Sequence, residues 1–444
     1  MKNEIEKRYM VFSEECKLNR VDAETVAGFL EKNGYLPSRV ATDLDLVIFV
    51  ACSFTQEKVD KMMKKVEILQ GAKKSDKITI GLTGCYLPSD EKKIKSKFDF
   101  IFKIKDLERL PEIIRGVYDK DNTIAGSDYF KIRRKYTGNL VSIGIPIMTG
   151  CNSFCSYCAI PSARGAEDSR QVRDILNEIS YVVSRGCVEI DLGGTTVNSY
   201  HPRDPENFSK KNPYKNSFAA LLWEINNIKG IARIKFGTPH PIFMDDEFID
   251  ALKLRKIVNY LSIHIQSGDD IILKKMNRKY DSKYILELVR KIREVKPGIR
   301  LETDVIVGFP GESVRAFQNT YELFRKIGFD NSSILIYSER KGTYAQKHYP
   351  DDVLLEEKVA RKKALKELQA DINTKKSSLL LGRVVSVLVD QEKDIRKEGN
   401  SLEMMRVAFP AKGKYIGRIV DVKVEKVLAG RLLGRLVMTN RKEG

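Results

Sequence analysis

The sequence has no long hydrophobic run and few cysteines, and each absence narrows the class of protein. No apolar stretch approaches the roughly 18 residues of a membrane-spanning helix, and the start MKNEIEKRYMVF lacks the apolar core of a signal peptide. We therefore expect a cytoplasmic protein with no membrane partner. Only seven cysteines occur in 444 residues. That odd number argues against a disulfide framework and favours metal binding or catalysis.

Acidic residues are outnumbered by basic ones. Lys and Arg total 78 against 60 Asp and Glu, a formal charge of +18. Such a charge favours a polyanionic partner, with nucleic acid the leading candidate, because phosphate neutralisation releases counterions. The alternative is a set of solvated Lys-rich helix faces. With 42% hydrophobic residues the chain is folded rather than disordered, and its length suits two large domains and a small one.

The alternation of strand and helix patterns in residues 1–125 predicts a small parallel α/β domain. Strand patterns cover 8–13, 45–50 and 77–84, and helices lie between them, the first opened by Asp22. Each strand is soon followed by a cysteine, which places Cys16, Cys52 and Cys85 at the ligand-binding end of one sheet. A lone cysteine is usually a buried small hydrophobe, but this shared placement favours a metal site. Residues 120–139 read as an exposed, basic linker.

Residues 137–374 predict a barrel or partial barrel of six parallel strands with helical crossovers, whose active site lies at the strands' carboxyl ends. A helix with the apolar stripe Val359, Ala360, Ala364, Leu365, Leu368 and Ile372 follows. Residues 375–444 alternate like strands and form a small all-β module. That module carries 16 Lys and Arg against 8 Asp and Glu. It suits RNA binding, although a solvated rim is an equally plain interpretation.

The motif TGCNSFCSYCAIPSARG carries the central chemistry. Cys151, Cys155 and Cys158 follow the first barrel strand with CxxxCxxC spacing. Three thiolates bind three irons of a [4Fe-4S] cluster and leave the fourth iron open, where S-adenosylmethionine (SAM) is able to chelate. Tyr157 occupies the position of an aromatic residue near the adenine. A structural zinc site is the alternative, but it requires a fourth ligand and more often uses CxxC pairs.

Later strand ends supply candidate SAM contacts. Gly193 and Gly194 would let the backbone approach the methionyl amine, although a plain turn explains them equally well. Gly308 is a candidate for close approach to the adenosine. Gln266 ends another strand together with His264, and a lone barrel histidine is more often a hydrogen-bonded filler than a ligand contact. We interpret Cys187 as a buried small hydrophobe.

The chain resembles the methylthiotransferase family of radical SAM enzymes over nearly its whole length. The matching segments are CKLN, ACSFT and TGCY around Cys16, Cys52 and Cys85, then CNSFCSYCAIPSARG, Ser169-Arg170, IQSGDD, MNRKY, TDVIVGFPGE and YSERKGT. The resemblance implies an N-terminal domain with a second [4Fe-4S] cluster on Cys16, Cys52 and Cys85. It also implies a radical SAM barrel and a C-terminal TRAM module that binds RNA.

The same resemblance implies the reaction. One cluster and SAM yield a 5′-deoxyadenosyl radical, the radical abstracts a hydrogen, and a methylthio group from the second cluster replaces it. GTPHP at 237–241 and IQSGDDIILKKMNRKY resemble the tRNA enzymes acting on isopentenyladenosine at position 37, whereas AIPSARG is closer to the ribosomal protein S12 enzyme. We favour the former, with threonylcarbamoyladenosine or S12 as alternatives. The expected partners are the tRNA anticodon loop, an electron donor such as flavodoxin or ferredoxin, and an unknown sulfur donor. The non-enzyme alternative is an RNA-binding protein with structural clusters.

Overall fold

The computed structural model describes residues 7–13, 17–40, 43–52, 56–71, 78–87, 94–117, 129–137, 139–237, 239–428 and 430–437. It divides into two compact units. The first unit contains Met1–Gly138 together with Met148–Arg170 and Arg340–Tyr344, and the second contains the remainder. None of the helices in these ranges combines the length and apolar composition that spanning a bilayer requires.

The first unit is built on a parallel sheet of five strands in the order β2-β1-β3-β4-β5. These are β1 (Arg8–Ser13), β2 (Leu36–Pro37), β3 (Leu46–Cys52), β4 (Thr79–Cys85) and β5 (Phe100–Ile101). Every residue of the central strand β3 is buried, because helix α1 (Lys17–Lys32) packs on one face of the sheet and α2 (Gln56–Gly71) on the other. The three strands predicted from the sequence are confirmed, and β2 and β5 are short additions at the edges.

Two local expectations for this unit were wrong. Asp22 does not open a helix, because α1 begins at Lys17 and Asp22 lies fully buried within it. Residues 129–137 are not an exposed linker either. Tyr129 and Phe130, in the short helix η4 (Tyr129–Lys131), are buried, and so is Arg134, which pairs with Glu24 of α1 at 3.3 Å. Residues 118–128 and 138 lie outside the described ranges.

Short elements complete the first unit. The short helix η2 (Lys95–Lys97) precedes β5, and η3 (Ile104–Arg109) and α4 (Leu110–Ile114) follow it. The strands β7 (Met148–Thr149) and β8 (Asp168–Ser169) pair in antiparallel fashion and flank the helix α5 (Ile160–Arg164). The segment that carries the CxxxCxxC motif therefore belongs to the same compact unit as the N-terminal sheet.

The second unit contains the predicted partial barrel. Its strands form two parallel three-stranded sheets: β6 (Ser142–Pro146), β9 (Glu189–Gly193) and β10 (Arg233–Phe236) in one, and β11 (Tyr260–Ser262), β12 (Arg300–Val307) and β13 (Asn331–Ile336) in the other. The crossover helices are α6 (Val172–Ser184), α7 (Ser217–Asn227), α8 (Asp246–Ala251), α9 (Asp270–Lys275), α10 (Ser282–Val295) and α11 (Val314–Ile327). All six predicted strands are present.

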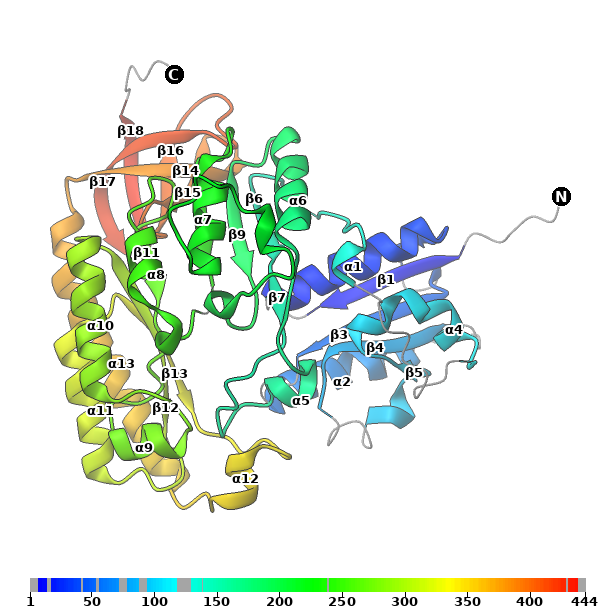
Figure 1. Ribbon diagram of the computed structural model, residues 1–444, viewed down its shortest axis with the longest axis horizontal. Coiled ribbons are helices and arrows are strands. Elements are labelled where there is room, and N and C mark those ends of the chain that lie inside the picture. Colours follow the sequence, from blue (N-terminus) through cyan, green and yellow to red (C-terminus); the bar gives the residue numbers. More distant parts are fainter. Residues whose placement is uncertain are drawn as a thin grey trace. The chain divides into compact units, whose positions relative to one another are not determined.

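Side chains at the helix starts explain where these crossovers begin. The oxygens of Asn216, Asp245, Asp269, Asp281 and Ser313 accept backbone N–H groups in the first turns of α7 to α11. Such caps satisfy donors that have no partner inside the helix. Figure 1 shows α10 and α11 on the outer side of β12 and β13, together with the long helix α13 (Leu355–Ser377). Along the chain, the short helix α12 (Tyr344–His348) lies between β13 and α13.

The predicted apolar stripe of α13 is only partly right. Leu365 and Leu368 are buried, but Val359 is 51% exposed. The buried face continues through Lys358 and Arg361 instead, because their charges meet the carboxylates of Asp351 and Glu312. Apolar periodicity could not reveal this face, since ion pairs rather than apolar contacts define half of it.

The C-terminal module is a closed barrel in the order β14-β15-β16-β18-β17. Its strands are β14 (Val384–Lys393), β15 (Arg396–Ser401), β16 (Arg406–Pro410), β17 (Ile419–Leu428) and β18 (Arg431–Val437). Arg233 of β10 joins the module to the partial barrel. Its buried guanidinium donates to the carbonyls of Ser386, Asn400 and Ser401 at 2.8, 2.7 and 3.2 Å.

Candidate cluster-binding sites

The three cysteines of the CxxxCxxC motif lie in one loop that is closed at its base. The pairing of β7 with β8 brings the ends of the loop together, and the backbone N–H of Cys151 donates to the Gly165 carbonyl at 3.2 Å. Gly150 has φ +74°, and a Cβ there would lie 1.9 Å from the Ala166 carbonyl oxygen. Only glycine fits that approach. Gly150 therefore allows the two ends of the loop to meet immediately before its first cysteine.

The thiols of this loop are partly exposed and two of them already accept backbone hydrogen bonds. Ser153 N donates to Cys151 Sγ at 3.4 Å, and Ile160 N donates to Cys158 Sγ at 3.5 Å. Cys155, the middle cysteine, accepts the N–H of Cys158 through its backbone carbonyl at 3.0 Å. Backbone N–H groups directed at thiolate sulfurs are one of the means by which proteins tune iron-sulfur clusters.

The donor set of this loop fits a [4Fe-4S] cluster. Among the described residues, no three His, Cys, Asp or Glu side chains converge closely enough to hold one metal ion. A [4Fe-4S] cluster does not require such convergence, because each thiolate binds its own iron. Three thiols on one loop, two of which accept backbone N–H groups at sulfur, therefore suit such a cluster.

Two of the three N-terminal cysteines lie side by side, as the sequence predicts. Cys52 and Cys85 are register partners at the carboxyl ends of β3 and β4. Lys58 Nζ lies 3.6 Å from Cys52 Sγ, and Arg164 Nε lies 2.8 Å from Cys85 Sγ. Nearby positive charges stabilise the thiolate, which is the form that binds metal. Cys16, the third member of this trio, lies outside the described residues.

Arg164 is a residue of this site that the sequence reasoning missed. It ends α5, and its Nη2 donates to Asp22 at 2.5 Å and to Asn19 Oδ1 at 3.3 Å. The Arg164 side chain is 2% exposed and that of Asp22 is 0% exposed. Burial acts to lower the pKa of Arg164, but the charges of Asp22 and Cys85 raise it well above its usual range. The only sequence signal for it is its place in the same motif as the cysteines.

Gln266 has the strongest structural indication among the predicted SAM contacts. It follows β11 with φ +65°, a backbone region that is strained for a side-chain-bearing residue. Its backbone is held by Asp304 O and Ile306 N of β12, both at 2.9 Å. The residue is 7% exposed, and its Oε1 has no hydrogen-bond partner within the described ranges. A buried acceptor without a donor costs about 1–3 kcal/mol, so this oxygen suits a ligand N–H or O–H.

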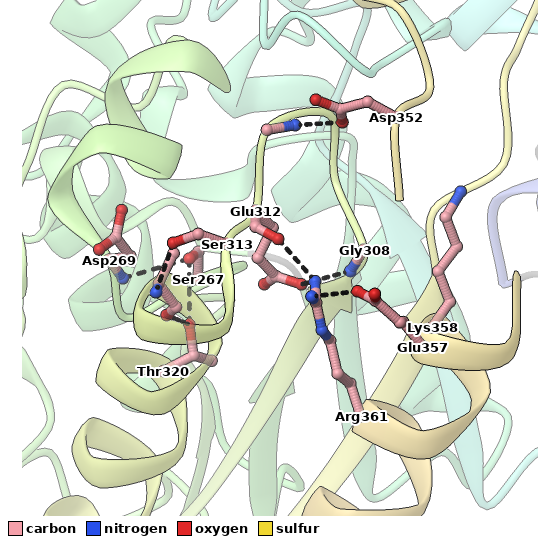
Figure 2. Close-up of polar contacts among 12 residues, drawn as sticks. Ser267, Asp269, Gly308, Glu312, Ser313, Thr320, Asp352, Glu357, Lys358 and Arg361 are labelled. Atoms are coloured by element: carbon pink, nitrogen blue, oxygen red, sulfur yellow. Dashed lines mark hydrogen bonds and ion pairs between the residues drawn. The ribbon is translucent and has the colours of Figure 1, made fainter. Parts of the chain in front are cut away.

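Gly308 is explained in part by the protein's own packing. Its φ is +70°, and an added Cβ would lie 2.2 Å from Lys358 Cγ. Its N–H donates to Glu312 Oε2 at 2.6 Å, and Arg361 holds both the carboxylate and the carbonyl of Glu312 at 2.8 Å (Figure 2). These contacts require glycine whether or not a ligand approaches. The adenosine contact of Gly308 stays a prediction.

The remaining predicted contacts lie where the sequence places them. Gly193 ends β9, and an added Cβ there would meet nothing closer than Ile145 O at 3.8 Å, so internal packing does not require this glycine. Gly194 follows it and is half-buried. Tyr157 is half-buried in the cysteine loop. Their contacts with SAM stay predictions.

His264 and Cys187 behave as ordinary interior residues. Nε2 of His264 lies 2.8 Å from Ser262 Oγ, and Nδ1 lies 3.3 Å from Asp304, so both ring nitrogens have partners within the barrel. Burial lowers the pKa of His264 and outweighs the nearby Asp304 carboxylate. Cys187 is 1% exposed, and burial raises the pKa of its thiol to about 11. The interpretation of Cys187 as a small hydrophobe is confirmed.

Comparison with known proteins gives matches over nearly the whole chain. The model of the Radical SAM superfamily matches residues 145–324, and that of the Uncharacterized protein family UPF0004 matches residues 8–103. A tRNA-2-methylthio-N(6)-dimethylallyladenosine synthase of Thermotoga petrophila is 33% identical over 97% of each chain. A synthase of the same name from Carboxydothermus hydrogenoformans is 34% identical over 97% of this chain and all of the other. This chain belongs to the methylthiotransferase family of radical SAM enzymes.

Solved structures agree on the fold of this methylthiotransferase. The radical SAM methyltransferase TsrM from Kitasatospora setae, with cobalamin and a [4Fe-4S] cluster bound, superposes with a TM-score of 0.56 at 13% identity, covering 77% of this chain and 74% of TsrM. The cobalamin-dependent radical enzyme OxsB gives a TM-score of 0.51 at 11% identity, covering 83% of this chain and 56% of OxsB. As a radical SAM methylthiotransferase, the protein uses SAM and two [4Fe-4S] clusters.

Proposed function

We propose that this enzyme adds a methylthio group to C2 of N6-isopentenyladenosine at position 37 of tRNA. The observation that carries the proposal is the identity of 33–34%, over nearly the full length of both chains, with enzymes named for N(6)-dimethylallyladenosine, which is the same nucleoside. Identity that extends over all parts of the chain supports a shared substrate more strongly than a match of the radical SAM barrel alone. We place the reaction in the cytoplasm, where tRNA is modified.

The cysteine loop holds the cluster that acts on SAM in this proposal. Cys151, Cys155 and Cys158 supply three thiolates, and the backbone N–H groups of Ser153 and Ile160 donate to two of the sulfurs. When bound here, a reduced [4Fe-4S] cluster supplies the electron that cleaves the sulfonium bond of SAM. Gln266 offers its buried Oε1 as an acceptor for a donor of the bound ligand. The chain's contribution is to orient these groups and to exclude water from them.

The second cluster is assigned to Cys16, Cys52 and Cys85. The register pairing of Cys52 with Cys85 and the positive groups Lys58 and Arg164 beside their sulfurs support this assignment. A cluster bound by three thiolates keeps an open iron that is able to take the sulfur to be transferred. We assign the remaining partners by role only, as an electron donor and a sulfur donor.

The C-terminal barrel supplies the RNA-binding surface in this proposal. Lys412, Lys414 and Arg418 are exposed on the connection between β16 and β17. Two other basic residues of this barrel are partly neutralised, because Arg431 pairs with Glu398 at 3.5 Å and Arg435 pairs with Glu425 at 3.1 Å. We therefore assign phosphate binding to Lys412, Lys414 and Arg418.

A turnover assay with three substrates tests the proposal. The reconstituted enzyme, SAM and a reductant are incubated with an anticodon stem-loop carrying isopentenyladenosine, with the unmodified stem-loop, and with ribosomal protein S12. We expect a methylthio product only on the isopentenylated RNA. Product on S12 alone, or on the unmodified stem-loop alone, would refute the assigned substrate. Absence of SAM cleavage in every arm would refute the assignment of the cysteine loop.

A further inference from the structure

Arg164 connects the cysteine loop to the cysteines of the N-terminal sheet. It ends the short helix that follows Cys158, and its Nε lies 2.8 Å from Cys85 Sγ. The next residue, Gly165, accepts the backbone N–H of Cys151 at 3.2 Å. Two adjacent residues therefore contact one cysteine of each trio. All of these groups belong to the first compact unit.

The surroundings of Arg164 hold its guanidinium in one orientation. Asp22 accepts from Nη2 at 2.5 Å, and Asn19 Oδ1 accepts from the same nitrogen at 3.3 Å. Asn19 is itself fixed, because its Nδ2 donates to the Ala51 carbonyl at 2.9 Å. An arginine often uses Nε together with Nη2 to bind both oxygens of one carboxylate. Here Nε is directed at the sulfur of Cys85 instead. The ion pair between Arg164 and Asp22 alone does not require that orientation.

We propose that Arg164 is a positioning residue that holds the Cys85 thiolate and raises the reduction potential of the second cluster. This inference rests on the proposed assignment of Cys16, Cys52 and Cys85 as that cluster's ligands. A positive donor at a ligand sulfur stabilises the reduced cluster more than the oxidised one, since the reduced cluster carries one more negative charge. Arg164 is 2% exposed at its side chain, so solvent screens this effect little.

The test isolates the second cluster in the full-length protein. Replacing Cys151, Cys155 and Cys158 by Ala leaves one cluster per chain, and its midpoint potential is measured by redox titration followed by electron paramagnetic resonance. Adding Arg164→Gln shifts the one-electron reduction equilibrium about tenfold toward the oxidised form, or about 59 mV to more negative potential. Arg164→Lys gives a smaller shift, because it keeps the charge but loses the planar fork of donors.

Two further variants separate the effect on potential from an effect on folding. Arg164→Gln leaves Asp22 as a buried unpaired charge, so the double variant Asp22→Asn/Arg164→Gln is measured as well. We expect a smaller negative shift than in Arg164→Gln, because the loss of the Asp22 carboxylate removes a nearby negative charge, whereas the donor to the Cys85 sulfur is still missing. Arg20→Gln is the matched control, since Arg20 lies on α1 next to Asn19 with a side chain that is 60% exposed, and its loss leaves the potential unchanged.

The outcomes distinguish the role of Arg164 from the assignment of Cys16, Cys52 and Cys85 as ligands of the second cluster. Full iron content with an unchanged potential in both Arg164 variants overturns the role of Arg164 alone. Absence of iron in the triple-alanine background overturns the assignment of the second cluster, and this inference with it. A shift as large in Arg20→Gln as in Arg164→Gln would also contradict the inference, because it would show a general effect of net charge.

Discussion

Arg361→Met perturbs the ion-pair network that joins α13 to the loop after β12. Glu312 is 2% exposed, and Arg361 Nη1 donates to both its carboxylate and its backbone carbonyl at 2.8 Å (Figure 2). Without Arg361, the Gly308 N–H at 2.6 Å is the partner that remains to the carboxylate among the described residues. Removing one partner of a buried pair costs about 3–5 kcal/mol. At about 2–4 °C per kcal/mol for a large domain, we expect Tm to fall by roughly 6–20 °C.

The stability of this variant depends on pH in a defined direction. Burial already raises the pKa of Glu312, although Gly308 and Arg361 partly offset the effect. Without Arg361 the folded protein binds this proton more tightly than the unfolded chain does. Stability is therefore fully retained below the ordinary carboxyl range and falls as pH rises through the raised pKa. Thermal unfolding followed by circular dichroism from pH 4 to pH 8 measures this trend.

Two matched variants test the reasoning. Glu312→Gln/Arg361→Met removes both charges and should recover much of the loss and remove the added pH dependence. Arg290→Met removes an exposed arginine that pairs with Glu287 and Glu294 on α10, and we expect no measurable change, because exposed pairs contribute little. If Arg361→Met were no less stable than Arg290→Met, the buried pair would not stabilise this unit as we argue.

Three other variants test separate parts of the molecule. Gln266→Leu should weaken SAM binding about tenfold, as measured by calorimetry. The Tm of the ligand-free protein should not fall, since the lost oxygen has no hydrogen-bond partner among the described residues, and unchanged affinity would refute the contact. Arg233→Met removes a buried guanidinium that donates to three carbonyls of the C-terminal barrel. It should cost about 3 kcal/mol and speed proteolysis of that barrel, and equal resistance would contradict its joining role. Replacing Lys412, Lys414 and Arg418 by Gln should lower the salt slope of tRNA binding by about 2–3 units, and an unchanged slope would exclude them as phosphate contacts.

The strands and the cysteine arrangement were predictable because their signals are local. The barrel strands are short segments with apolar residues that end before a turn, and this local pattern identifies them without knowledge of their partners. Cys52 and Cys85 end consecutive parallel strands, so the topology alone makes them neighbours. The CxxxCxxC spacing likewise places three thiols on one loop whatever the rest of the chain does.

The buried charges were not predictable because their partners are distant in the sequence. Asp22 looks like a helix cap until Arg164 is known to lie beside it. Arg134 reads as part of an exposed basic run until Glu24 is placed against it. Arg361 breaks an apolar stripe because Glu312 faces it from another loop. In each case tertiary pairing overrides the local rule that charged residues mark the surface.

The central claim is methylthiolation of isopentenyladenosine in tRNA. Its most direct test is mass spectrometry of tRNA nucleosides from a strain in which the gene is deleted and then restored as the wild type or as Cys155→Ala. We expect deletion to remove 2-methylthio-N6-isopentenyladenosine and to leave N6-isopentenyladenosine in its place. The wild-type gene should restore the modified nucleoside, and Cys155→Ala should not, because the cluster loses one of its three thiolates. A full level of the methylthio nucleoside in the deletion strain, or in the Cys155→Ala strain, would contradict the account.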